Sequence, residues 1–196
     1  GHRCVCAVEW EPYAQAVLIA RQNDGSLPPF PIWDDVQTFD GRPWRGIVDI
    51  VAGGFPCQAY SSAAAGKNNA DDLWPEMRRI VADVAPRYVF VENVQQRAID
   101  AAADDLQEMG YEVRCVCLAA SDLGADHIRR RYWLLAHANL HGELLGSVDA
   151  EMESCSGIQN GVWATDPDQS RMDDGLAFGM DRIKAVGNGQ VPLCAA

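Results

Sequence analysis

Residues 46–57, GIVDIVAGGFPC, decide the fold, because they run from an apolar segment into two glycines, a proline and a cysteine. A short apolar run bounded by turn formers is typical of a strand buried in a sheet. Gly53 and Gly54 allow a backbone or a ligand to approach closely, and Pro56 stiffens the chain just before Cys57. We therefore predict a buried strand that ends by presenting a thiol.

Strand-like and helix-like segments alternate around this stretch. The strand-like segments are rich in β-branched and aromatic residues, whereas the helix-like segments space apolar residues three and four positions apart. Such alternation predicts an α/β fold with a doubly wound, mostly parallel sheet that helices cover on both faces. Strands are predicted at residues 3–10, 46–54, 87–94, 111–120 and 131–138, and helices at 11–22, 73–85 and 98–110.

Composition bounds the class of protein. The chain has 196 residues, 48% of them hydrophobic, so it can bury one sizeable core, and no apolar run is long enough to span a bilayer. The beginning, GHRCVCAVEW, has neither an initiator Met nor a secretory leader, so we expect a single soluble domain whose start is cut. The net charge of -12 argues against nucleic-acid binding, although HIRRRYW at 127–133 places three arginines together.

Seven cysteines raise the question of disulfides or zinc. An odd count in a chain of this length does not suggest a disulfide scaffold, and the two CVC segments have one residue between the thiols instead of the two to four of zinc knuckles. We interpret them as small core residues in a reducing cytosol and expect no bound metal. The cysteines are Cys4, Cys6, Cys57, Cys115, Cys117, Cys155 and Cys194.

Chemically useful side chains follow the predicted strands, where ligands gather in open α/β sheets. Glu9 is either a ligand for ribose hydroxyls or a solvated acid at a helix start. Cys57 is either a nucleophile or a small buried residue, and Glu92 is either a proton donor to a ring nitrogen or a capping acid. Asp34 and Asp35 also follow an apolar segment.

Five motifs, in this order, resemble the DNA cytosine-5 methyltransferases. They are EWEPYAQ at 9–15, GGFPCQAYS at 53–61, FVENV at 90–94, GADHIRRRYWLLA at 124–136 and AVGNGQVP at 185–192. The resemblance covers about 1–136 and 181–192, and it implies the Rossmann-like fold of S-adenosylmethionine-dependent methyltransferases. The order of five motifs is far more specific than any one of them.

The resemblance implies a covalent mechanism. Cys57 matches the nucleophile that adds to C6 of cytosine, so that C5 attacks the methyl group of S-adenosyl-L-methionine. Glu92 matches the glutamate that engages N3 and the exocyclic amine. Arg131 matches the arginine that contacts O2 of the base, and Arg129 matches its neighbour that orders the active-site network.

The resemblance also implies binding residues. The segment SSAAAGKNNADD at 61–72 resembles the loop that closes over a base flipped from double-stranded DNA, with a bare flexible surface loop as the alternative. The implied DNA contacts are Gln58, Ser61, Ser62 and Lys67. The implied cofactor contacts are Glu9, Trp10, Asp35, Val36, Pro56, Leu73 and Asn188.

The chain departs from the family pattern in several places. The first strand and its glycine-rich loop have no counterpart before Gly1, and His127 stands where the family commonly has Gln. Residues 137–180 hold no period and are dominated by turn formers and acids, so this region is loop, a reduced subdomain or partly disordered. We expect a partial catalytic and cofactor-binding domain at 1–136, a reduced target-recognition or linker region at 137–180, and a C-terminal motif at 181–196 that returns to the catalytic domain.

The expected activity is therefore that of a DNA cytosine-5 methyltransferase cut at both ends. Two alternatives stay open: a tRNA-methylating branch of the same family, and an inactive fragment that only binds. The resemblance further implies a cytoplasmic monomer, encoded by a bacterium or a phage, that does not associate with a membrane. It also implies a restriction–modification system with a cognate restriction endonuclease.

Overall fold

The computed structural model describes residues 2–55, 72–124 and 128–138, and no helix in these ranges is long and apolar enough to cross a membrane. The chain divides into two compact units. Since 139–196 lie outside the described residues, the division at 136 and 180 stays a prediction. In its described residues the first unit consists of 2–10, 29–55, 72–118 and 130–138, and the second of 11–28, 119–124 and 128–129.

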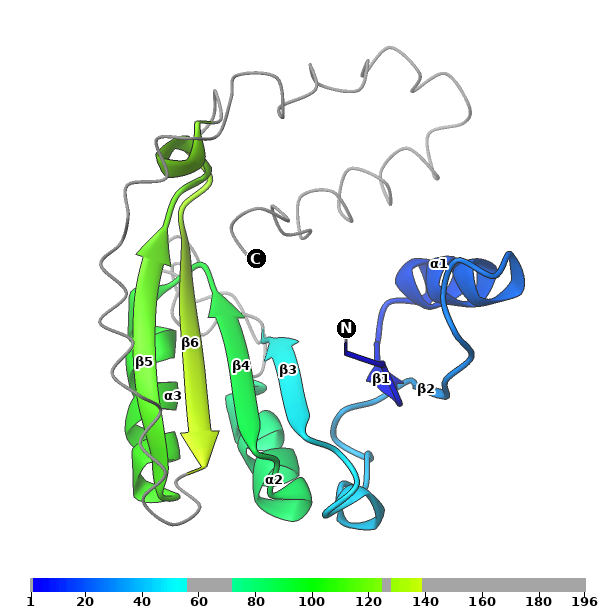
Figure 1. Cartoon of the computed structure of the whole chain (residues 1–196), viewed down its shortest axis with the longest axis horizontal. Coiled ribbons are helices and arrows are strands. Elements are labelled where there is room, and N and C mark those ends of the chain that lie inside the picture. The colour runs from blue at the N-terminus through cyan, green and yellow to red at the C-terminus, as the bar shows by residue number, and fades with distance from the viewer. Residues whose placement is uncertain (1, 56–71, 125–127, 139–196) are drawn as a thin grey trace. The chain divides into compact units, whose positions relative to one another are not determined.

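A four-stranded sheet forms the centre of the first unit, with the strand order β3-β4-β6-β5 (Figure 1). β3 and β4 pair in parallel, whereas β6 is antiparallel to both β4 and β5, so three of the four strands run in one direction. A second pair, β1 and β2, is also parallel. The predicted α/β class with a mostly parallel sheet is confirmed. The strands are β1 (Ala7–Val8), β2 (Ile32–Trp33), β3 (Ile50–Gly54), β4 (Tyr88–Asn93), β5 (Tyr111–Leu118) and β6 (Arg131–Ala138).

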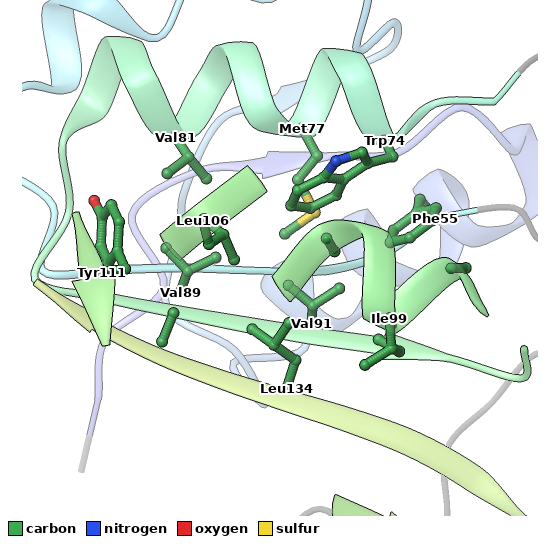
Figure 2. Packing of buried hydrophobic residues seen from close by; sticks show 13 residues of the cluster. Phe55, Trp74, Met77, Val81, Val89, Val91, Ile99, Leu106, Tyr111 and Leu134 are labelled. Carbon is green, nitrogen blue, oxygen red and sulfur yellow. The ribbon is translucent and has the colours of Figure 1, made fainter. Parts of the chain in front are cut away.

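Two helices, α2 (Trp74–Val84) and α3 (Gln96–Glu108), cover one face of the four-stranded sheet. Val89 and Val91 alternate with more exposed residues along β4 and pack with Leu106 of α3 in the main core (Figure 2). Fully burying each such aliphatic side chain contributes about 1.5–3 kcal/mol. The expected helical cover of the second face stays a prediction, because the described residues of this unit contribute helices to one face.

The predicted helices are confirmed within one or two residues at each end. α1 (Pro12–Asn23) begins with a proline, whose missing amide hydrogen would have no partner in the first turn. α2 ends at Val84; the next residue, Ala85, adopts the left-handed conformation with φ 48, and the buried Pro86 follows. Two short 3₁₀ helices complete the described elements, η1 (Arg42–Trp44) and η4 (Ala120–Leu123).

Four predicted strands are shorter in the structure than in the sequence pattern: β4 and β5 by two residues each, and β1 and β3 by more. Ala7 donates its amide to the carbonyl of Pro31, but Pro31 has no amide to return, so the β1–β2 ladder begins only there. Gly46 has φ 73 and follows η1, and this turn delays the start of β3 to Ile50. The separate pairing of β1 with β2 also divides the expected sheet into two hydrogen-bonded groups.

The cysteine interpretation is wrong for three described residues. Cys4, Cys115 and Cys117 are exposed free thiols, and Cys6 is half-buried. The helices cover the first half of the edge strand β5, at Tyr111 and Val113, but leave its second half open. Within the described ranges, no group of three metal-ligating side chains is present, and the expectation of no metal stays a prediction for the whole chain.

A close approach between η1 and α2 gives the first testable prediction. A Cβ atom at Gly41 would lie 2.9 Å from Asp83 Cβ and 3.2 Å from Val84 Cγ2. Because these atoms belong to a packed helix, Gly41→Ala should lower the free energy of unfolding by about 1–3 kcal/mol in urea denaturation.

Gly53→Ala is the matched control for this substitution. A Cβ atom there would meet only the flexible end of Met77, at 3.5 Å, which is an ordinary contact. The control should therefore leave the stability nearly unchanged. Equal stabilities for the two variants would contradict the packing described here.

Candidate functional site

The carboxyl ends of β3 and β4 meet at one point of the sheet. The parallel register places Gly54 directly beside Glu92. Glu92 lies on the opposite face of β4 from Val91, and its side chain is only 14% exposed. Its Oε1 forms an ion pair with Arg131 Nε at 2.8 Å, and the Arg131 side chain is 16% exposed. The structure thus brings together two of the predicted catalytic residues as a largely buried ion pair.

The position of Arg131 follows from the antiparallel pairing of β6 with β4. Trp133 lies directly opposite Glu92, and Arg131, two residues earlier on the same strand, emerges on the same face. A terminal nitrogen of Arg131 also donates to the carbonyl of Arg130 at 2.9 Å. A carboxylate held in this way is fixed in orientation, and it can exchange hydrogen bonds with a ring nitrogen or an amino group of a ligand.

Gly54 supplies the space that this carboxylate occupies. A Cβ atom at Gly54 would lie 3.1 Å from Glu92 Oε2 and 3.5 Å from the Glu92 carbonyl oxygen. Any larger residue would push the carboxylate away from its present place. The sequence identified Gly54 as a point of close approach, but it did not show that a catalytic candidate is what approaches.

Asn93 joins the ends of the same two strands from the other face of the sheet. Its side chain is 2% exposed, and its Nδ2 donates to the carbonyl of Phe55 at 3.0 Å, while Oδ1 accepts from the amide of Gln95 at 2.9 Å. The ring of Phe55 packs against Trp74 at 5.4 Å between centroids. No role was predicted for Asn93, although it lies inside the FVENV motif.

Trp133 is a second residue whose place was not predicted. It is 3% exposed and stacks on Phe90 at 5.3 Å between centroids. Its indole Nε1 is buried and has no hydrogen-bond partner within the part of the chain that the structure describes. Since Trp133 lies opposite Glu92, it contributes an aromatic wall next to the ion pair.

The carboxyl ends of β1 and β2 bring the predicted cofactor residues together. Val8 pairs with Trp33, and the amide of Glu9 donates to the Trp33 carbonyl at 2.9 Å, so Glu9 and Trp10 lie beside the segment that starts at Asp34. Trp10 is 73% exposed and leaves its ring open to a ligand.

The turn after β2 is held by α2. Asp35 Oδ1 accepts from the amide of Gln37 at 2.9 Å, which closes the turn. Arg79 of α2 donates to the carbonyls of Val36 and Phe39, each at 2.8 Å. The predicted residue Leu73 precedes α2, is half-buried and packs against the main core. Arg79 was not predicted, because its partners are backbone atoms about 40 positions away.

Of the remaining predicted residues, the structure describes only Arg129. Arg129 is half-buried, has φ 29 and belongs to the second unit. Because Cys57 lies outside the described residues, the proposal that it faces Glu92 stays a prediction, supported by the pairing of Gly54, three residues earlier, with Glu92. The residues outside the described ranges are Pro56, Cys57, Gln58, Ser61, Ser62, Lys67, His127 and Asn188.

Known proteins resemble this chain in sequence. The family model described as C-5 cytosine-specific DNA methylase matches residues 1–163. Type II methyltransferase M.NgoMIV of Neisseria gonorrhoeae is 30% identical over 148 residues, which cover 71% of this chain and 46% of that protein. Type II methyltransferase M.HhaI of Haemophilus parahaemolyticus is 30% identical over 150 residues, covering 71% of this chain and 43% of that protein. The chain thus spans under half the length of either relative.

Solved structures share the fold. The putative DNA modification methyltransferase encoded within an E. coli prophage has a TM-score of 0.51 and 22% identity, covering 71% of this chain and 41% of that one. The S. pombe Dnmt2 methyltransferase has a TM-score of 0.53 and 21% identity, covering 77% of this chain and 50% of that one. At these identities the likeness supports the fold alone.

The buried ion pair generates the second prediction. Arg131→Met leaves the Glu92 carboxylate largely buried without its cation, so the free energy of unfolding should fall by about 3 kcal/mol in urea denaturation. The double variant Arg131→Met with Glu92→Gln should recover part of this loss, with a coupling of about 1–3 kcal/mol.

Arg130→Met is the matched control, because Arg130 is exposed and the adjacent residue in the same motif. It should change the stability by no more than about 0.5 kcal/mol. If Arg130→Met and Arg131→Met were equally stable, the pairing of Arg131 with Glu92 would contribute nothing to folding.

Proposed function

This chain belongs to the C-5 cytosine-specific DNA methylase family, and from that premise we propose that it forms part of an enzyme that methylates C5 of cytosine in DNA. The observation that carries the proposal is the meeting of β3, whose continuation holds Cys57, with Glu92 and its partner Arg131. These are the residue types that the covalent chemistry of cytosine requires: Glu92 lies on β4, Arg131 on β6, and Cys57 follows the end of β3 by three residues in the sequence.

The proposed reaction begins at Cys57. Its thiolate forms a bond to C6 of cytosine, which breaks the C5–C6 double bond and leaves its electron pair on C5, shared with C4 and N3, so that the ring becomes an enamine with a nucleophilic C5. Glu92 engages N3 and the exocyclic amine and stabilises the charge that develops as sulfur adds. C5 then attacks the methyl group of S-adenosylmethionine, whose sulfonium leaves as the thioether S-adenosylhomocysteine. Loss of the C5 proton to a base lets the bond between C6 and the cysteine sulfur break, and the thiolate is regenerated.

Arg131 has two tasks in this proposal. Its Nε is taken by Glu92, so the contact to O2 of the base would come from a terminal nitrogen. The same guanidinium then holds the carboxylate and the base oxygen in one plane. Arg129 supports this network, as the family resemblance implies.

S-adenosyl-L-methionine is the methyl donor of this family, and when bound it supplies an electrophilic methyl group. The residues present fit it, because an exposed tryptophan and two acids follow the paired ends of β1 and β2. We propose that Glu9 binds the ribose hydroxyls, Trp10 packs on the adenine, and Asp35 with Val36 reads the adenine edge. Leu73, Pro56 and Asn188 would complete the pocket.

The proposed substrate is double-stranded DNA from which the target cytosine is flipped. Flipping lets the enzyme reach both faces of the base, which is stacked inside the duplex otherwise. Gln58, Ser61, Ser62 and Lys67 are the proposed DNA contacts, and segment 61–72 the proposed closing loop. The Type II names of the relatives suggest a bacterial or phage setting with a cognate restriction endonuclease.

The covalent step is tested with Cys57→Ser in the complete protein. Turnover should be lost almost entirely, because an alcohol is hardly ionised near neutral pH whereas a cysteine is partly thiolate. Glu92→Gln should lower turnover about 10²- to 10⁴-fold, since it keeps the shape but loses the acid. The measurement is transfer of labelled methyl groups to DNA, with tRNA as the competing substrate.

DNA carrying 5-fluorocytosine supplies the independent readout. Fluorine cannot leave C5 as a proton does, so the wild-type protein should give a covalent adduct that runs as a shifted band on a denaturing gel. Cys57→Ser should give none. Methylation by the wild type without a trapped band, or normal turnover by Cys57→Ser, would show that the thiol is structural. Methylation of tRNA alone would move the enzyme to the tRNA branch, and no transfer at all would favour a protein that only binds.

The cofactor assignment is tested with Trp10→Ala. Loss of a stacking ring should weaken S-adenosylmethionine binding about 10- to 100-fold in calorimetry on the complete protein. Stability should not change, because the ring is 73% exposed. Ile47→Ala, which removes another exposed apolar side chain of the same unit, is the control and should leave affinity unchanged. Equal affinities for wild type and Trp10→Ala would show that Trp10 does not contact the cofactor.

A further inference from the structure

We propose that Asn93 is a positioning residue, which fixes the backbone leading to Cys57 relative to the Glu92 carboxylate. This inference rests on the proposed function, since it assigns Asn93 a task only if Cys57 and Glu92 act on the same base. The task differs from that of Glu92, although the two residues are neighbours in the sequence. Asn93 touches neither the base nor the cofactor, and it acts through the peptide backbone.

The geometry begins with the end of the β3–β4 ladder. The parallel pairing extends as far as Gly54 and Glu92 and stops there. The next carbonyl, that of Phe55, belongs to a residue only 7% exposed, so it needs a partner other than water. Asn93 Nδ2 is that partner, at 3.0 Å. The side chain thus continues the ladder by one residue after the backbone pairing has ended.

The orientation of the Asn93 amide is set at both of its ends. Nδ2 faces a carbonyl, which can only accept, while Oδ1 faces the amide of Gln95, which can only donate, at 2.9 Å. Rotating the amide by half a turn would place oxygen against oxygen and nitrogen against nitrogen. A buried side chain with both groups paired in this way has little freedom, and it transmits a fixed position to Phe55.

The ring of Phe55 is held as firmly as its carbonyl. It packs against Trp74, the first residue of α2, and Trp74 Nε1 donates to Asp105 of α3 at 2.7 Å. The backbone at Phe55 is therefore fixed by β4 through Asn93 and by both helices through Trp74. Figure 2 shows Phe55 and Trp74 lying against each other at one end of the core. One residue, Pro56, separates Phe55 from Cys57 in the sequence.

Neighbouring residues on β4 consequently serve opposite faces of the sheet. Glu92 points to the face where Arg131 lies, whereas Asn93 points to the face covered by the helices. Because one strand carries both, any shift of β4 moves the carboxylate and the Phe55 backbone together. This coupling keeps the proposed nucleophile and the proposed proton donor at a fixed separation, and a reaction between positioned groups depends on that separation.

Asn93→Ser tests the proposal in the complete protein. The serine hydroxyl is one bond shorter than the amide and does not reach the Phe55 carbonyl, and it adds no buried charge. The matched control is Tyr111→Phe, which also removes one buried hydrogen bond to a backbone carbonyl, from Tyr111 Oη to Pro86 at 2.9 Å. Tyr111 lies beside Ala138, the last residue of β6, whereas Arg131 is the first residue of that strand. The control is therefore at the opposite end of β6 from the ion pair.

Three readouts separate positioning from stability. Asn93→Ser should lower kcat about 10- to 100-fold and slow covalent trapping on 5-fluorocytosine DNA by the same factor, because a displacement of about 1 Å has this effect. The Kd for S-adenosylmethionine should change less than about threefold. Tyr111→Phe should lose comparable stability in urea denaturation while keeping wild-type kcat and trapping rate.

Asn93→Leu gives a second variant in case the serine variant does not fold. It keeps about the same side-chain volume at a buried position, adds no charge and removes the donor to Phe55, so it should show the same loss of kcat and trapping. Equal kcat and trapping rates for an Asn93 variant and Tyr111→Phe would overturn the positioning role. Failure of the wild type itself to form an adduct would instead refute the proposed function, so the two failures are distinguishable.

Discussion

The ion pair between Glu92 and Arg131 is the interaction on which the rest of the site depends. Two charges that are both about six-sevenths buried are tolerated only when their geometry is good, because each loses its water shell. That geometry needs β6 to run antiparallel to β4 with Arg131 as its first residue, and it needs Gly54 to leave room for the second carboxylate oxygen. A single buried contact thus depends on both the pairing of two strands and one glycine.

Hydrophobic periodicity predicted most of the elements, and the exceptions have local causes. β6 occupies the predicted range 131–138, because the apolar segment that forms it starts directly after a run of arginines. β1 and β3 are shorter than predicted, since Pro31 cannot return a hydrogen bond and Gly46 turns the chain. The cysteines of β5 were expected in the core, but sequence patterns do not show which strand lies at an edge.

The site residues were predictable one by one, whereas their partners were not. HIRRRYW offers three arginines, and only the register of β6 against β4 shows that Arg131 meets Glu92. The sequence offered no reason to select Asn93, because an amide is not a reactive group and its contribution is a hydrogen bond to a backbone carbonyl. Motif resemblance identifies residues that touch the substrate, and it is less informative about residues that hold the backbone beneath them.

Helix α2 links the two pairs of strand ends. Its first residue, Trp74, packs against Phe55 at the end of β3, while Arg79 in its middle holds the carbonyls that follow β2. Ile80 and Val84, further along, bury Phe39 in a second small core. One helix therefore fixes the turn proposed to read adenine and the strand end proposed to lead to the nucleophile. Methyl transfer requires a fixed distance between the methyl donor and the base. A rigid helix that contacts both proposed binding segments helps to keep that distance constant.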